Sequence, residues 1–180
     1  NITRNDRTLT LDIEYKLSNG PRVFVERIDI KGNATTLDKV IRRQFNVVEG
    51  DPFNPREIRQ SAERIKALDF FSQSRVEPRE GSSPDQVIID VSVVEKPTGS
   101  LGFGGSYSST TGLGAEITFQ ERNFLGRGQA LGLAVSTTTT NKKLEFNFRE
   151  PAFLGRNLSA GIELSYVTNT PDDVSFNSNA

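Results

Sequence analysis

The four-residue string Phe-Leu-Gly-Arg occurs twice in this chain, at Phe124–Arg127 and at Phe153–Arg156. Each copy lies between segments in which apolar and polar residues alternate, the pattern of a half-buried β-strand. The copies start 29 residues apart, which fits a unit of strand, loop, strand and turn. The repeat therefore predicts stacked β-hairpins. The predicted turn residues are Phe124, Leu125, Gly126 and Arg127 in the first copy and Phe153, Leu154, Gly155 and Arg156 in the second.

Composition divides the chain into two parts. Residues 1–97 contain 16 Lys and Arg, 16 Asp and Glu and four glycines. Residues 98–180 contain six Lys and Arg, seven Asp and Glu and eleven glycines. The first part is typical of a charged α+β module, and the second of all-β material that depends on backbone pairing. We therefore expect a domain boundary near residue 97.

Several function classes are excluded by what the chain lacks. Its net charge of −1 is of mixed sign, so no basic surface indicates nucleic-acid binding. Without histidine or cysteine, the chain has no usual general base, thiolate or soft-metal ligand. The carboxylates Glu116, Glu145 and Glu163 are better explained as the water-facing lining of a β-barrel than as an acid–base pair. We expect no enzyme activity, no catalytic residue, no metal and no cofactor.

The first part of the chain has the pattern of a small sheet covered by helices. A strand-like segment at residues 8–17 starts the chain without a visible partner, so we expect a longer protein with its targeting segment upstream. Strand 23–30 follows, with a bulge near Arg27, and then a helix over 37–45 capped by Thr35 or Thr36. A second helix starts at Asn54 and Pro55, and strands 72–78 and 86–94 end the module. Solvated helix surface is the simplest interpretation of the basic residues Arg42, Arg43, Arg59, Arg64 and Lys66.

The second part contains five segments that alternate with period two. One face of each is apolar: Leu101, Phe103 and Tyr107; Ala115, Ile117 and Phe119; Leu131, Leu133 and Val135; Leu144, Phe146 and Phe148; Leu158, Ala160, Ile162, Leu164 and Tyr166. Either a soluble sandwich or a membrane barrel has this alternation. The connections favour the barrel, because short turns with the repeated string are expected on one side and looser polar loops, 108–112 and 137–141, on the other. Since five strands cannot close, we expect the opening piece of a larger barrel.

Longer strings carry a family resemblance. They are RVFVERIDIKGN at 22–33, VIRRQF at 40–45, EGDPFN at 49–54, ERIKALDFF at 63–71, PTGSLGFGGSYS at 97–108, ERNFLGRG at 121–128 and EPAFLGR at 150–156. In this order they resemble the outer-membrane assembly factors of the POTRA-plus-barrel superfamily, where POTRA means polypeptide-transport-associated. The resemblance implies the closing strand of one POTRA domain at 1–20, the last POTRA domain at 21–97 and the first five barrel strands at 98–180. One departure is Asp69, at a helix end where the family usually has glycine.

The resemblance also implies a function. Such proteins fold and insert β-barrel proteins, here called clients, into the outer membrane without nucleotide energy. The barrel would lie in the cell outer membrane and the POTRA part in the periplasm. Implied partners are unfolded outer-membrane proteins, accessory lipoproteins of the assembly complex and outer-membrane lipid, with no nucleic acid.

The resemblance places the client-pairing seam on the first barrel strand. Its members are Gly99, Ser100, Leu101, Gly102, Phe103, Gly104, Gly105, Ser106, Tyr107 and Ser108. A strand rich in Gly and Ser packs weakly, so its free edge is available to a client strand by β-augmentation, after the edge of the POTRA sheet has guided the client. The segment that matches an accessory-lipoprotein contact contains Arg42, Arg43 and Gln44; its alternative is plain solvated surface.

Three rival interpretations remain open at this point. A sister transporter, such as a two-partner secretion pore or a translocation-and-assembly factor, would differ in the number of POTRA domains. A passive porin or a soluble β-rich binding protein would belong to another class. We also expect an isolated fragment to self-associate through its free strand edges, which light scattering would detect.

Overall fold

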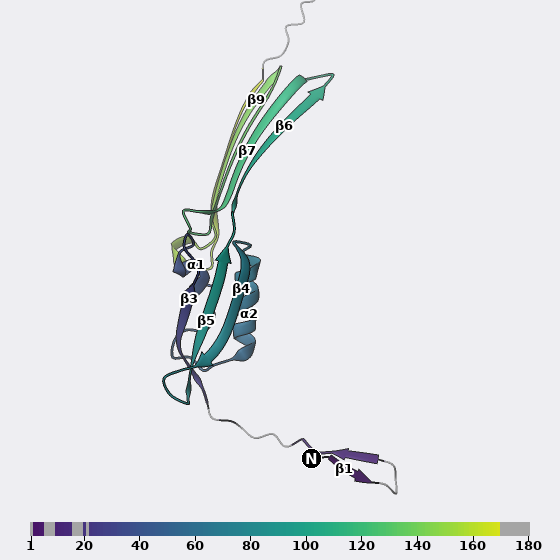
Figure 1. Ribbon diagram of the computed structural model, residues 1–180. Helices are drawn as coiled ribbons and strands as arrows, with labels where there is room; N and C mark the ends of the chain where they lie inside the picture. Colours follow the sequence, from purple (N-terminus) through teal and green to yellow (C-terminus); the bar gives the residue numbers. More distant parts are fainter. Residues whose placement is uncertain (1, 6–9, 16–19, 21, 170–180) are drawn as a thin grey trace, which may run out of the picture.

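The computed structural model describes residues 2–5, 10–15, 20 and 22–169. These residues form three separate sheets (Figure 1). The first is a hairpin of β1 (Ile2–Asn5) and β2 (Thr10–Ile13), which pair antiparallel. The strand expected over 8–17 is thus shorter among the described residues, and β1 is the partner that the sequence did not reveal. Residues 8, 9, 16 and 17 lie outside the described residues.

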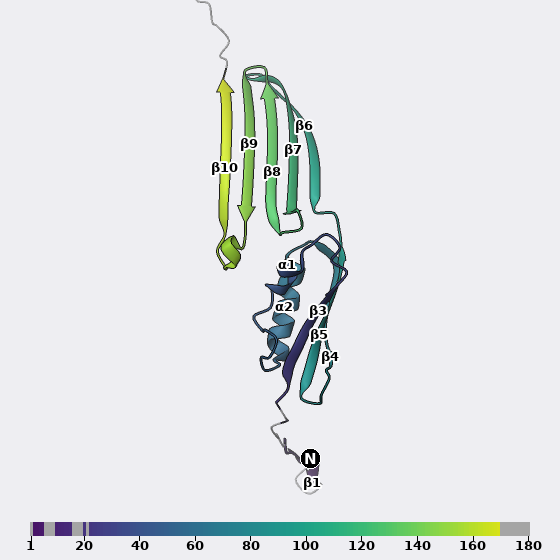
Figure 2. The ribbon, with the colours of Figure 1, turned by 90° about the vertical axis from the view of Figure 1, so that its left-hand side faces the viewer.

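The second sheet, with its helices, is an α+β domain. It contains β3 (Phe24–Lys31), β4 (Phe71–Glu80) and β5 (Gln86–Glu95) in the order β3-β5-β4, with β3 parallel and β4 antiparallel to β5. The helices α1 (Asp38–Arg42) and α2 (Pro55–Ala67) cover one face (Figure 2). The predicted order of strand, two helices and two strands is confirmed, as is the bulge, since the β3 register shifts between Val25 and Arg27.

The core of this domain lies between the helices and the sheet. Buried side chains come from β3 (Val25, Ile28), α1 (Val40, Ile41), α2 (Ile58, Ile65) and β5 (Val87, Ile89, Val91, Val93). The start of α2 is as expected, because the Asn54 side chain accepts the Arg56 N–H at 3.0 Å and Pro55 takes the first helical position. Within the described residues, no helix has the length and apolar character needed to cross a membrane.

The predicted cap of the first helix is wrong, and the helix ends at Arg42, earlier than expected. Helix α1 is five residues long, its N-cap is Leu37, and no side chain caps it. The backbone N–H groups of Thr35 and Thr36 instead donate to the Glu95 carboxylate, at 2.9 and 2.6 Å. A carboxylate at the end of β5 thus binds the groups ahead of the helix, and the threonines do not cap it.

The third sheet has five antiparallel strands. These are β6 (Gly99–Ser108), β7 (Gly112–Phe124), β8 (Gln129–Thr138), β9 (Asn141–Glu150) and β10 (Ala160–Asn169). They lie side by side in the order β10-β9-β8-β7-β6, so β6 and β10 are the edges of the described sheet (Figure 2). The expected fold class, an α+β domain followed by the antiparallel strands of an incomplete barrel, is confirmed.

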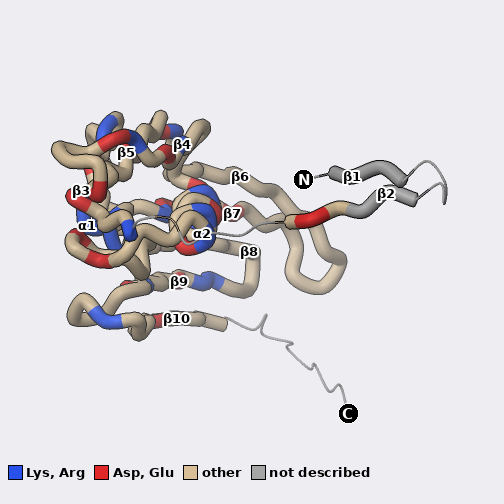
Figure 3. Tube along the Cα trace, turned by 90° about the horizontal axis from the view of Figure 1, so that it is seen from below, with Lys and Arg blue, Asp and Glu red and all other residues tan. Residues whose placement is uncertain are grey.

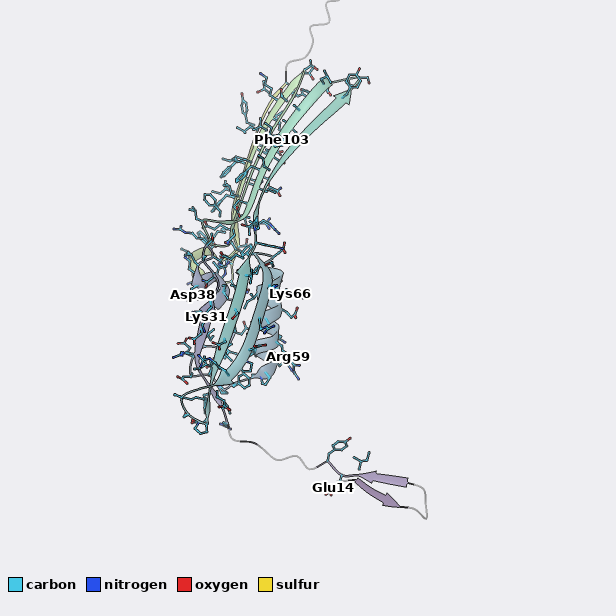
Figure 4. All side chains as sticks on the ribbon, in the orientation of Figure 1. Glu14, Lys31, Asp38, Arg59, Lys66 and Phe103 are labelled. Atoms are coloured by element: carbon cyan, nitrogen blue, oxygen red, sulfur yellow. The ribbon has the colours of Figure 1, made fainter. Side chains whose placement is uncertain are left out.

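The register aligns apolar side chains in rows across all five strands. One row is Leu101, Phe119, Leu133, Phe146 and Leu164, and the next is Phe103, Ile117, Val135, Leu144 and Tyr166. Phe103, labelled in Figure 4, is 75% exposed, and Tyr107 is 77% exposed. From Leu101 to Tyr107 the apolar face extends roughly 20 Å along the strand, at about 3.3 Å per residue. The other face carries charges, including the Lys143–Glu145 ion pair at 2.7 Å.

The expected difference in connection length is reversed. The Ser- and Thr-rich connections are tight, spanning only residues 109–111 and 139–140, whereas the connections with the repeated string span 125–128 and 151–159. Threonine favours strands, so the neighbouring strands extend into the expected loops. Leu158, expected in the fifth strand, lies in the connection before β10.

Candidate strand-pairing edge and domain junction

The strand β6 has one paired edge and one open edge. It pairs with β7 along its whole length, from Gly99 opposite Glu121 to Ser108 opposite Gly112. No strand of the described chain lies on its other side. A row of backbone N–H and C=O groups at this edge is therefore free to pair with another strand. All ten residues predicted for the seam lie on this one strand.

Two glycines of β6, Gly104 and Gly105, have open space where a side chain would begin. A Cβ built on Gly104 would have the Glu116 Cβ, at 3.8 Å, as its nearest neighbour, and one on Gly105 only the Gly114 carbonyl oxygen, at 3.9 Å. Packing against β7 therefore does not require glycine at either position. Their effect is to leave β6 with little side-chain contact, which weakens pairing on both of its edges.

Both copies of the repeated string form the same turn. Positive φ angles occur at Leu125 (53°) and Gly126 (68°), and again at Leu154 (54°) and Gly155 (72°). The Arg127 N–H donates to the Phe124 carbonyl at 3.1 Å, and the Arg156 N–H donates to the Phe153 carbonyl at 3.1 Å. Two central residues with positive φ define a type I′ turn. Both predicted turns lie at the same end of the sheet, next to the α+β domain (Figure 1).

The two turns differ in their surroundings. In the first, the Leu37 N–H donates to the Gly126 carbonyl at 2.8 Å, and a Cβ on Gly126 would overlap the Thr35 carbonyl oxygen. At Gly155 nothing lies within 4 Å of such a Cβ. Among the described residues, only the first of the two turns forms a backbone hydrogen bond with the α+β domain, and in this sense only the first is docked.

One residue explains this difference. Asn123, 6% exposed, donates from Nδ2 to the Thr36 hydroxyl at 2.8 Å and accepts the Gly128 N–H at 2.8 Å. The corresponding residue of the second copy is Ala152, which has no side-chain amide. Asn123 was not predicted as a functional residue, although its position immediately before the repeated string distinguishes the two copies.

Glu95 fixes Thr36, the residue of the α+β domain that binds Asn123. Burial opposes its ionisation, but the hydrogen bonds from Thr36 and Thr35 outweigh burial, and the pKa of Glu95 lies below its usual value. A charged Glu95 fixes the two threonines, and Thr36 in turn binds Asn123. The end of β5, the start of α1 and the end of β7 are thereby joined by a single chain of hydrogen bonds.

Asp69 forms a second connection between the domain and the sheet. It has a φ of 60°, the left-handed conformation expected at this helix end. Its carboxylate pairs with Lys96 on the linking segment and with Arg122 on β7. Hydrogen bonds from Lys96 and Arg122 lower the pKa of Asp69 to about 2. An aspartate in place of the expected glycine therefore supplies ion pairs across the junction.

The three residues predicted for the accessory contact do not form one free patch. Arg42, at the end of α1, binds Asp38 and Glu49 at 3.2 Å and the Ile28 carbonyl at 3.1 Å. Arg43, the C-cap, lies against Gly128 of the first turn. The Gln44 side chain donates to the Val40 carbonyl at 3.1 Å. By contrast, Arg59 and Lys66 lie exposed along the outer side of α2 (Figure 4).

Two family models match this chain. The POTRA model, described as surface antigen variable number repeat, matches residues 23–96, and the Omp85 superfamily domain matches residues 123–180. Among curated proteins, the outer membrane protein assembly factor BamA of Neisseria meningitidis is 30% identical over 76% of this chain. BamA of Nitratidesulfovibrio vulgaris is 33% identical over 66% of it. The chain spans only 17% and 15% of these two relatives.

Solved structures give the same relationship. BamA from Haemophilus ducreyi lacking POTRA domains 1–3 superposes with a TM-score of 0.81 at 28% identity, covering 94% of this chain and 32% of that one. CdiB from Escherichia coli gives a TM-score of 0.58 at 16% identity, covering 86% and 30%, and shares the fold alone. The BamA likeness is thus stronger in both sequence and shape.

Proposed function

Because this chain belongs to the Omp85 superfamily of POTRA-plus-barrel proteins, we propose that the protein folds and inserts β-barrel proteins into the outer membrane. Its five-stranded sheet is located in the outer membrane and its POTRA domain in the periplasm. The division into a closing strand at 1–20, a POTRA domain at 21–97 and barrel strands at 98–180 belongs to the same proposal.

The open edge of β6 is the observation that supports the mechanism. A client strand that pairs with this edge adds a sixth strand to the sheet, and its backbone groups exchange water for partners in the sheet. The register constrains the client, because a one-residue slip would turn its apolar side chains away from the lipid. Correct pairing extends the rows that begin at Leu101 and Phe103.

The POTRA sheet offers an earlier pairing site along β4. The other edge strand, β3, is partly covered, since Val25 exchanges hydrogen bonds with Gly50 and Asp51, at 2.7 and 2.9 Å. The outer edge of β4 has no neighbouring strand in the described chain. Pro78 removes one donor from it, so residues 71–77 are the part that we propose to guide a client.

Photo-crosslinking in the full-length protein tests the seam. A benzoylphenylalanine at Phe103 or Tyr107 of β6 is expected to capture a client stalled during insertion. The same probe at Phe146 of β9 is the control, because it replaces an aromatic residue on the same apolar face in the interior of the sheet. Equal capture at Phe146, or no capture on β6 while the client still inserts, would contradict client pairing at this edge.

The accessory-lipoprotein contact at Arg42, Arg43 and Gln44 is a further part of the proposal. Exchanging Arg42 and Arg43 for glutamate is expected to reduce co-purification of the lipoproteins at least fivefold, because the local charge is reversed. Exchanging Arg59 and Lys66 for glutamate makes the same change on the outer side of α2. Undiminished binding by the first variant, or equal loss in both, would assign these arginines to ordinary surface.

A further inference from the structure

A cavity lies where the POTRA domain meets the apolar side of the five-stranded sheet. Its volume is about 530 Å³, and its lining includes Lys39 and Arg43 from the POTRA domain and Phe148 from β9. The second turn closes one side with Phe153 and Leu154. Figures 1 and 2 both show that turn beside α1, at the lower end of β9 and β10.

The polar part of the cavity is rich in cations. The lining contains three cations, Lys39, Arg43 and Arg127, and one carboxylate, that of Glu150. Both oxygens of Glu150 are already bound, one by the Gln129 side-chain amide at 2.6 Å and one by the Ala152 N–H at 2.9 Å. Among the described residues, none of the three cations forms an ion pair within 4.0 Å. Three cations and one carboxylate thus leave the described lining with a net positive charge.

The apolar part of the cavity continues the membrane-facing surface. Phe148 stands in a row with Leu131 and Ile162, and this is the row of apolar side chains nearest the POTRA domain. Below it the strands end and the POTRA domain begins (Figure 1), and the view from below shows basic and acidic residues together on that domain (Figure 3). In the outer-membrane placement proposed above, on which this step rests, the cavity lies at the height where the hydrocarbon of the bilayer gives way to phosphates.

We propose that this cavity binds the headgroup of an anionic glycerophospholipid from the periplasmic leaflet. The phosphate lies among Lys39, Arg43 and Arg127, and the acyl chains follow the apolar face past Phe148. Phosphate and guanidinium groups form charge-assisted hydrogen bonds, and the apolar wall selects against anions without acyl chains. This site is independent of client insertion, and its lipid would bridge the POTRA domain and the sheet on the side where the second turn is not docked.

The test counts lipids retained by the full-length protein in native mass spectrometry. The variant is Lys39→Gln with Arg127→Gln, which keeps Arg43 because that residue packs on the first turn. Arg59→Gln with Lys66→Gln is the matched control, since it removes the same charge from the outer side of α2. The probe is dioleoyl phosphatidylglycerol, and glycerol phosphate at the same concentration is the competitor without acyl chains.

The expected result is at least tenfold weaker retention of phosphatidylglycerol by the cavity variant and unchanged retention by the control. Folding of both is verified by the shift in electrophoretic mobility on heating. Equal retention in the two variants, or equal loss, would overturn the site. Displacement of phosphatidylglycerol by an equal concentration of glycerol phosphate would also overturn it, because the cavity would then bind a free anion as well as it binds the lipid. A variant that loses lipid but inserts clients supports the site, whatever the outcome for the assembly function.

Discussion

Replacing Gly126 with alanine is expected to detach the POTRA domain from the first turn, whereas alanine at Gly155 is expected to have a small effect. Both glycines have a positive φ, 68° and 72°, so each substitution carries the same backbone cost of about 1 kcal/mol. Only at Gly126 does the new Cβ also overlap the Thr35 carbonyl. The turn must then move away and lose its hydrogen bond to Leu37.

The movement would also disturb Asn123. Its side chain is buried between Thr36 and Gly128, and a buried amide that loses its partners costs about 1–3 kcal/mol. Together with the strain, the total for Gly126→Ala is roughly 3 kcal/mol or more. That is enough to favour an undocked arrangement, while Gly155→Ala leaves every contact between the domain and the sheet in place.

Distance measurements between spin labels would detect the difference. The chain has no cysteine, so Arg59→Cys on α2 and Lys142→Cys on β9 would provide its two labelling sites. A single narrow distance distribution is expected for the parent and for Gly155→Ala, and a broad one for Gly126→Ala. Equally narrow distributions in both variants would show that the first turn does not hold the domain.

The parts of the fold that the sequence predicted depend on local patterns. Alternation with period two decides which face each side chain occupies, so all five strands of the sheet were predicted, and Asn54 with Pro55 located the start of α2. The left-handed conformation of Asp69 was also expected, because a helix end requires it whatever lies further along the chain.

The parts that were not predicted depend on distant partners. Thr35 and Thr36 look like helix caps, but Glu95, about 60 residues away, binds their N–H groups. The two copies of Phe-Leu-Gly-Arg have the same sequence and similar backbone conformations, yet only the copy preceded by Asn123 is docked against the α+β domain. The ion pair of Asp69 with Arg122 joins residues 53 positions apart. No local periodicity encodes such contacts, so the junction was missing from the sequence-based prediction of the site.

The second large effect is expected at the seam, where Gly104→Val should slow client insertion about fivefold. A Cβ at this position has no neighbour closer than 3.8 Å, so a β-carbon is accommodated without displacing the backbone of β7. Valine has a higher strand propensity than glycine and restricts the unfolded chain, which together stabilise β6 by about 1 kcal/mol. Gly104 pairs with Glu116 on the charged face, so the apolar rows remain unchanged.

A control must distinguish stabilisation of β6 from stabilisation of the sheet as a whole. Ala134→Val makes a similar change on β8, which is paired on both sides and has no free edge. Hydrogen exchange of the β6 amides would report the tighter seam, and the rate at which a model client inserts into proteoliposomes would report function. We expect slower exchange on β6 together with slower insertion for Gly104→Val, and unchanged insertion for Ala134→Val. If Gly104→Val slows exchange on β6 but clients insert at the parental rate, the weak pairing of this strand has no part in insertion, and the Gly- and Ser-rich sequence of β6 would need another explanation.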